Sequence, residues 1–305
     1  MGKAERIRQT NARQRIAAQQ AAARRAEARR RMYLASGSVL GVIAIVIGLI
    51  VWKNASSNSA SASSQKATAA ETSLVARQIT TVPAATLDAV GKGSSVSPLT
   101  PTSGQPLLTS SSGKPQILYM GALYCPYCGA ERWAMAVALS RFGTFSNLGL
   151  THSSGSDVYA NTPTLSFYKS SYTSNYVDFT PVEMYSGKLV RTNVYATLEK
   201  PTSAQIALMT KYDAAPYVQA SAAGSFPFID IGNQYLVIGS QFLPSSLANL
   251  TWTQVAADIR NPNSPVAKSV DGAANSITAA ICKITKNAPA AVCNSASAQA
   301  GAGSL

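Results

Sequence analysis

Residues 117–128 place an apolar strand directly before two cysteines that are separated by two residues. Residues 129–142 follow with Ala, Trp, Met, Val and Leu at recurring positions, which predicts a helix. A cysteine at a helix N-terminus has a lowered pKa, because free backbone N–H groups and the helix dipole stabilise its thiolate. We therefore expect Cys125 to act as a nucleophile and Cys128 to resolve the mixed disulfide. Pro126 fits the first helical turn, where its missing N–H costs no hydrogen bond.

The C-x-x-C pair has other interpretations, namely half of a zinc site or a plain structural disulfide. The remaining candidate zinc ligands are Cys282, Cys293 and the single histidine, His152. Because ten residues separate the two distant cysteines, their spacing does not match a zinc half-site. A third alternative is a metallochaperone that binds a soft ion such as Cu(I). The sequence has no Met-rich or His-rich segment near the C-x-x-C pair, which argues against this alternative. We favour redox chemistry, with no metal and no cofactor.

The net charge of +13 is concentrated at the N-terminus. Residues 1–32 hold ten of the 26 Lys and Arg residues with only two acidic residues, and residues 34–52 follow without any charge. As a helix, this uncharged run would be about 28 Å long, enough to span a bilayer core. Tyr33 and Trp52 stand at its ends, where aromatic side chains prefer the membrane interface.

These features predict a basic cytoplasmic tail over residues 1–32 and a single transmembrane helix over residues 33–52 that contacts membrane lipid. The positive-inside rule places the rest of the chain outside the cytoplasm. The basic residues then serve orientation, and we expect no nucleic-acid partner because aromatic residues are not interleaved with them. A cleaved signal peptide, with a small-residue site near residues 59–62, is the alternative.

Beyond the membrane run, composition divides the chain into three parts. Residues 53–74 are mostly Ser, Ala, Asn and Gln, which predicts a flexible linker. Residues 75–293 contain the apolar segments of one domain, and residues 294–305 are small and polar, which predicts a disordered tail. Within the domain we expect further strands and helices. The strands are predicted at residues 148–152, 164–168, 176–179, 182–185 and 188–195, with a hairpin over 224–238, and the helices at 202–212, 251–259 and 265–286.

The order of strand, Cys-Pro-Tyr-Cys, helix, inserted segment, proline-led hairpin and final helix resembles the thioredoxin fold. The layout is also similar to that of a family of membrane-tethered thioredoxin-like proteins from archaea and bacteria known only as a domain of unknown function. The similarity covers about residues 75–293 and is strongest at 117–133, 225–238 and 278–293. It implies an α/β fold with a central mixed sheet flanked by helices, with insertions, after the N-terminal transmembrane helix.

The resemblance also implies roles for single residues. Pro227 falls where thioredoxin-like proteins place a cis-proline that faces the disulfide, and Phe226 would offer its backbone to a substrate peptide. The alternative is a trans proline that begins an edge strand. Tyr124, Pro126 and Tyr127 are the other expected substrate-binding residues, with Tyr124 replacing the tryptophan of thioredoxin.

The acid that would exchange a proton with Cys128 is not obvious, because the preceding strand carries no buried carboxylate. Glu131, one turn after Cys128, is a candidate proton relay, and a solvated helix residue is its alternative. Cys282 and Cys293 are expected to form a structural disulfide, since outside the cytoplasm an isolated pair of thiols tends to oxidise. A second redox pair that exchanges electrons with the first is the alternative.

These expectations together predict a membrane-anchored, extracytoplasmic thiol-disulfide oxidoreductase of envelope proteins. Its partners would be cysteine-containing extracytoplasmic proteins and a redox partner that recycles the C-x-x-C pair. The competing prediction is a non-catalytic thioredoxin-like module that binds envelope proteins and carries an incidental disulfide.

Overall fold

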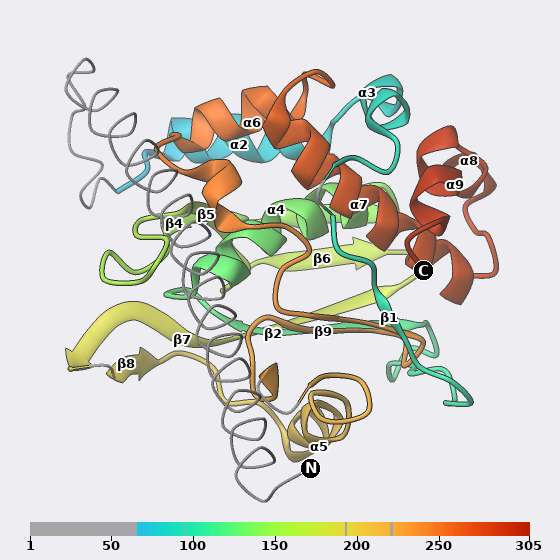
Figure 1. Cartoon of the computed structure of the whole chain (residues 1–305), viewed down its shortest axis with the longest axis horizontal. Coiled ribbons are helices and arrows are strands. Elements are labelled where there is room, and N and C mark those ends of the chain that lie inside the picture. Colours follow the sequence, from blue (N-terminus) through green and yellow to red (C-terminus); the bar gives the residue numbers. More distant parts are fainter. Residues whose placement is uncertain (1–65, 95, 193, 220–221) are drawn as a thin grey trace, which may run out of the picture. The chain divides into compact units, whose positions relative to one another are not determined.

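A six-stranded mixed sheet forms the centre of the described chain (Figure 1). The computed structural model describes residues 66–94, 96–192, 194–219 and 222–305. In sheet order the strands are β1 (Thr100–Pro101), β10 (Tyr235–Ile238), β9 (Phe228–Ile231), β2 (Gln116–Ala122), β7 (Asp178–Arg191) and β8 (Val194–Thr197). Strand β2 runs parallel to β7 and antiparallel to β9, and the other neighbouring pairs are antiparallel.

The central strand β2 is buried on both faces, which explains why its sequence is an unbroken apolar run. Successive side chains of a strand point to opposite faces. Ile117 and Tyr119 belong to the larger hydrophobic core, whereas Leu118 and Met120 belong to a smaller core on the other face. The predicted first core strand is therefore correct.

Helices cover both faces of this sheet (Figure 1). Helices that contribute buried side chains to the larger core include α2 (Ala69–Thr80), α3 (Ala84–Val90), α4 (Pro126–Ser140), α6 (Trp252–Ile259) and α7 (Pro265–Ile284). Helix α5 (Ser203–Tyr212) lies on the opposite side, where Tyr212 packs into the smaller core. The three helices that the sequence predicted at residues 202–212, 251–259 and 265–286 are thus confirmed within two residues.

The segment between α4 and β7 forms two short antiparallel pairs instead of extending the central sheet. Strand β3 (Gly143–Ser146) pairs with β6 (Ser171–Ser174), and β4 (Gly149–His152) pairs with β5 (Pro163–Ser166). The three strands predicted at residues 176–179, 182–185 and 188–195 are instead one long strand, β7, and the start of β8. The predicted hairpin is present as β9 and β10, joined by a turn in which Gly232 and Asn233 both have positive φ.

The expectation of a flexible linker up to residue 74 was wrong at its end. Helix α2 begins at Ala69, with Thr68 as the N-cap that accepts the Glu71 N–H, and it buries Val75 and Ile79. The apolar residues that anchor this helix lie in its second half. The composition of its first half therefore gave no sign of it.

The expectation of a disordered tail over residues 294–305 was also wrong, because helix α9 (Ala296–Ala302) packs there. Its buried residues are Ser297, Ala298 and Gly301. A Cβ on Gly301 would overlap the backbone of Asn275 in α7, so the small side chains of this segment permit close contact between the two helices. The domain therefore extends beyond both predicted limits of 75 and 293.

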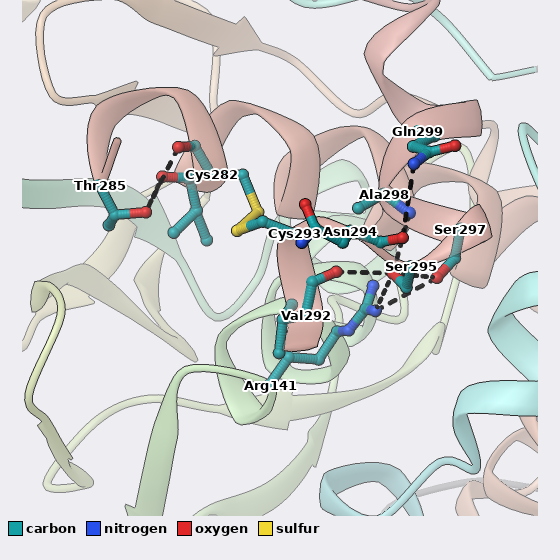
Figure 2. The surroundings of a disulfide bond; sticks show 11 residues. Arg141, Cys282, Thr285, Val292, Cys293, Asn294, Ser295, Ser297, Ala298 and Gln299 are labelled. Atoms are coloured by element: carbon teal, nitrogen blue, oxygen red, sulfur yellow. Dashed lines mark hydrogen bonds between the residues drawn. A yellow bond between two sulfur atoms is a disulfide. The ribbon is translucent and has the colours of Figure 1, made fainter. Parts of the chain in front are cut away.

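The C-terminal helices are also joined covalently (Figure 2). Cys282 of α7 forms a disulfide with Cys293 of α8 (Ala290–Cys293), the pairing that their spacing favoured. Beside it, Arg141 at the end of α4 donates hydrogen bonds to the hydroxyls of Ser295 and Ser297. The disulfide and these bonds fix α8 and α9 to the body of the domain.

The predicted basic tail over residues 1–32 and the predicted transmembrane helix over residues 33–52 lie outside the described residues. Among the helices of residues 66–305 that the structure describes, none combines the length and the apolar character needed to cross a membrane.

Candidate functional site

The two cysteines of the C-x-x-C pair lie where β2 ends and α4 begins. Cys125 is the N-cap of α4 with an extended backbone, and its sulfur accepts the N–H of Cys128 at 3.4 Å. Pro126 occupies the first helical position, as predicted. The helix therefore directs a backbone donor and the positive end of its dipole at the Cys125 sulfur.

The two sulfurs differ in their access to solvent. Cys125 is 8% exposed, whereas Cys128 is fully buried, and both are free thiols in this structure. An external thiol can therefore reach Cys125 first.

The surroundings also shift the pKa values of the two thiols in opposite directions. Hydrogen bonding from the Cys128 thiol, together with the Cys128 N–H and the positive charge of Arg132, lowers the pKa of Cys125 despite its partial burial. Burial raises the pKa of Cys128 well above its ordinary value. Neighbouring groups whose pKa values are pushed apart are suited to different chemical roles, here a more acidic thiol at Cys125 and a less acidic one at Cys128.

A segment from the other end of the domain faces Cys125. The Phe226–Pro227 peptide bond is cis, the isomer that was predicted, and Pro227 is buried at the start of β9. The Cys125 sulfur lies 3.7 Å from the carbonyl oxygen of Phe226. Both predicted residues are therefore next to the C-x-x-C pair.

Aromatic side chains surround the reactive cysteine. Tyr124 stacks on Tyr195 of β8, with ring centroids 3.9 Å apart and planes 8° from parallel. Tyr127 meets the edge of Tyr159, with centroids 5.7 Å apart. Tyr195 and Tyr159 were not predicted to belong to the site. Both lie in later segments of the chain, and no local sequence pattern indicated that these segments fold next to the C-x-x-C motif.

Two hollows open on either side of Phe226. The first, which we call the tyrosine hollow, has a volume of about 310 Å³ and is lined by Tyr124, Tyr185, Val194, Tyr195 and Phe226. The second, the methionine hollow, has a volume of about 480 Å³ and includes Met120, Met184, Pro201, Ile206, Met209 and Phe226 in its lining. Methionine side chains adapt to apolar groups of different shapes. The arrangement is thus suited to an extended peptide with apolar side chains next to its cysteine.

A buried ion pair lies beneath the cysteines, and no sequence pattern predicted it. Arg132 donates to both carboxylate oxygens of Glu183 at 2.8 Å and to the carbonyl of Ala122 at 2.7 Å. Both charged side chains are fully buried. Arg132 lies one turn after Cys128, whereas Glu183 reaches it from β7 because β7 is parallel to β2.

Glu131 has a different environment from the one expected of a proton relay. It is fully buried, and one carboxylate oxygen accepts the N–H of Gln241 at 2.9 Å. Burial raises its pKa to about 7. Within the described part of the chain it has no hydrogen bond to either sulfur, so its predicted role has no geometric support, and the alternative of a solvated residue is wrong.

The described residues contain no cluster of three or more His, Cys, Asp or Glu side chains arranged to hold a metal ion.

Comparison with known proteins relates the chain to a family. A family model described as a domain of unknown function, DUF929, matches residues 102–283, which is more than half of the chain. The chain belongs to this family. No curated protein matches it, and no solved structure does.

The DUF929 match includes most of the candidate site. Cys125, Cys128, Glu183, Phe226 and Pro227 all lie inside it. Of the disulfide-bonded cysteines, Cys282 lies inside the match and Cys293 outside. The family description gives no activity.

Proposed function

We propose that the protein is a thioredoxin-like thiol-disulfide oxidoreductase, anchored in the membrane by residues 33–52 with its domain outside the cytoplasm. The observation that carries this proposal is the pair of sulfurs at the start of α4. Cys125 is partly accessible and has a lowered pKa, and the buried Cys128 lies one helical turn away. This is the arrangement that a nucleophilic and a resolving thiol require.

The topology supports the thioredoxin-like part of the proposal. The C-x-x-C helix follows the central strand β2, a parallel strand lies on one side of β2, and an antiparallel hairpin lies on the other. Phe226 and Pro227 lead into that hairpin, and the carbonyl of Phe226 faces Cys125.

In the oxidising direction, a client thiolate attacks the sulfur of Cys125 in the Cys125–Cys128 disulfide. A bond forms between the client sulfur and Cys125, and Cys128 leaves as a thiolate with the electron pair of the broken bond. A second client thiolate then attacks the client sulfur of this mixed disulfide and releases Cys125 as a thiolate. The client gains a disulfide, and a disulfide-bearing redox partner must reoxidise the protein.

In the reducing direction the same steps run backwards, with the Cys125 thiolate attacking a client disulfide. The reduction potential relative to the partners sets the net direction. In both directions the client sulfur must approach Cys125 beside the Phe226 carbonyl. The tyrosine hollow and the methionine hollow then receive the side chains that flank the client cysteine.

The experiment that tests this function is a trap with the full-length protein in its native membrane. The Cys128→Ser variant lacks the resolving thiol, so clients should remain bound to Cys125 as mixed disulfides. We expect adducts that dithiothreitol releases and that mass spectrometry identifies as cysteine-containing extracytoplasmic proteins. Cys125→Ser is the matched control and should trap far fewer. If Cys128→Ser forms no adducts, while a double Cys125→Ser/Cys128→Ser variant still retains partners, the protein is a binding module and the oxidoreductase proposal is wrong.

A further inference from the structure

The hydroxyl of Tyr119 is fully buried in the larger core and has no hydrogen-bond partner among the described residues. A buried hydroxyl without a partner destabilises a folded protein, and such groups in native structures need an explanation. The Tyr119 hydroxyl lies close to the sulfur of Cys128.

Gly121 explains how the hydroxyl reaches the cysteines. Both Tyr119 and Gly121 lie on the same face of β2, so the tyrosine ring extends over the glycine. A Cβ at Gly121 would overlap the Tyr119 hydroxyl and would lie 3.1 Å from the Cys128 sulfur. The hydroxyl and the buried sulfur are therefore neighbours, and any larger residue at position 121 would separate them.

Other polar groups lie near Cys128, among them the backbone N–H of Ala122 and the guanidinium of Arg132. The guanidinium of Arg132 donates to Glu183, to the Ala122 carbonyl and to Thr164. Its positive charge acts on both thiols, but the structure gives it no hydrogen bond to either sulfur within the described residues. Tyr119 is thus a side chain beside Cys128 whose hydroxyl donor has no partner among the described residues.

We propose that the Tyr119 hydroxyl donates a hydrogen bond to the thiolate of Cys128 when a client breaks the Cys125–Cys128 disulfide. The inference rests on the proposed function. In that step the client sulfur bonds to Cys125, Cys128 leaves with the electron pair, and the tyrosine keeps its proton while stabilising the new charge. Because its hydroxyl contacts a reacting sulfur, Tyr119 would be a catalytic residue that favours departure of the leaving group.

Two properties of the site agree with this role. Burial raises the pKa of Tyr119 well above its ordinary value, so the hydroxyl remains a donor. Burial also raises the pKa of Cys128, so its thiolate is costly to form in the absence of a donor. The hydroxyl is left without a partner while Cys128 is a protonated thiol, and it gains one when the thiolate forms.

The test compares Tyr119→Phe with Tyr212→Phe in the purified, oxidised full-length protein. Both substitutions remove one buried hydroxyl that lacks a partner, but Tyr212 packs in the smaller core on the other face of the sheet. Reduced glutathione serves as the attacking thiol, and acid quenching with mass spectrometry follows opening of the Cys125–Cys128 disulfide. We expect Tyr119→Phe to slow this opening about tenfold or more, because a hydrogen bond to a charged group is lost.

Thermal unfolding separates this role from a structural one. Because the hydroxyl has no partner in the reduced protein, Tyr119→Phe should leave the reduced form equally stable or more stable, and Tyr212→Phe should open its disulfide at the wild-type rate. A Tyr119→Phe variant that opens as fast as the wild type overturns this inference alone, as does equal slowing in both variants. A wild-type disulfide that does not react with glutathione overturns the proposed function as well.

Discussion

The sulfur of Cys125 lies 3.7 Å from the carbonyl oxygen of Phe226, although 100 residues separate them in the chain. The helix that carries the thiol and the segment that precedes β9 meet there, with a hollow on each side of Phe226. Under the proposed function, we expect a client cysteine that reaches Cys125 to lie against Phe226, with its neighbouring side chains in the hollows. This relationship leads to a prediction about client preference.

Peptides with a leucine next to the cysteine should react faster with the oxidised protein than peptides with a serine there. Burial of a leucine side chain contributes about 1.5 to 3 kcal/mol, so the preference should be at least about tenfold. Ile206 lines the methionine hollow and is 49% exposed, so Ile206→Asp should abolish most of this preference without unfolding the protein. Stopped-flow kinetics with the two peptides measure the effect.

Two controls accompany that measurement. Leu243→Asp places the same charge at a similarly exposed residue outside the hollow, and it should retain the leucine preference. The reaction with glutathione, which has no side chain to place in the hollow, should be similar in all variants. Equal rates for the leucine and serine peptides in the wild type would contradict the assignment of this hollow to clients.

Loss of one partner of the Arg132–Glu183 ion pair should destabilise the protein more than loss of both partners. Arg132→Met should destabilise the protein by about 3 to 5 kcal/mol, because it leaves the Glu183 carboxylate buried and unpaired. The double variant Arg132→Met/Glu183→Leu should recover most of that loss, yet its Cys125 pKa should remain higher than in the wild type because the nearby positive charge is gone. Urea unfolding and thiol alkylation measure the two effects, and an unchanged Cys125 pKa in the double variant would contradict the role of Arg132.

The local parts of this arrangement follow from the sequence. The apolar run of β2, the C-x-x-C pair at a helix start and the proline before the hairpin are contiguous signals, and each is found where it was predicted. Their meaning depends on residues within a few positions of one another. Such short-range patterns are what sequence reasoning detects best.

The rest of the site depends on contacts that no short pattern carries. Glu183 meets Arg132 only because β7 pairs with β2 in parallel, and Tyr195 stacks on Tyr124 only because β8 folds back on β7. Tyr119 resembles any core aromatic residue until Gly121 is seen to open its path to Cys128. The sequence offered one neglected signal, a glycine within the apolar strand, which often marks a close approach of other atoms.

A buried acid in helix α7 predicts how stability changes with pH. Asp271 of α7 is fully buried, and neither carboxylate oxygen has a partner among the described residues. Burial raises its pKa to about 8, so the folded state holds the proton more tightly than the unfolded state. The contribution of Asp271 to stability should therefore be most favourable below pH 4 and should become less favourable as pH rises towards 8.

Asp271→Asn isolates this effect. The variant should be more stable than the wild type at pH 8 by at least about 2 kcal/mol, and this advantage should shrink towards pH 5, where the wild-type carboxyl is protonated. Urea unfolding at the two pH values provides the free energies. Asp88→Asn is the matched control, since Asp88 is an acid whose pKa is lowered by hydrogen bonds from Ser297, and its substitution should not stabilise the protein at pH 8. An advantage of Asp271→Asn that is the same at both pH values would contradict the assignment.

The most direct test of the central claim is the pH dependence of alkylation at each of the two thiols in the reduced full-length protein. Iodoacetamide labelling followed by mass spectrometry distinguishes Cys125 from Cys128. We predict that Cys125 reacts first, with a midpoint below the value of about 8.5 of a free cysteine, and that Cys128 stays protected at neutral pH. Preferential labelling of Cys128, or a Cys125 midpoint at or above about 8.5, would contradict the account.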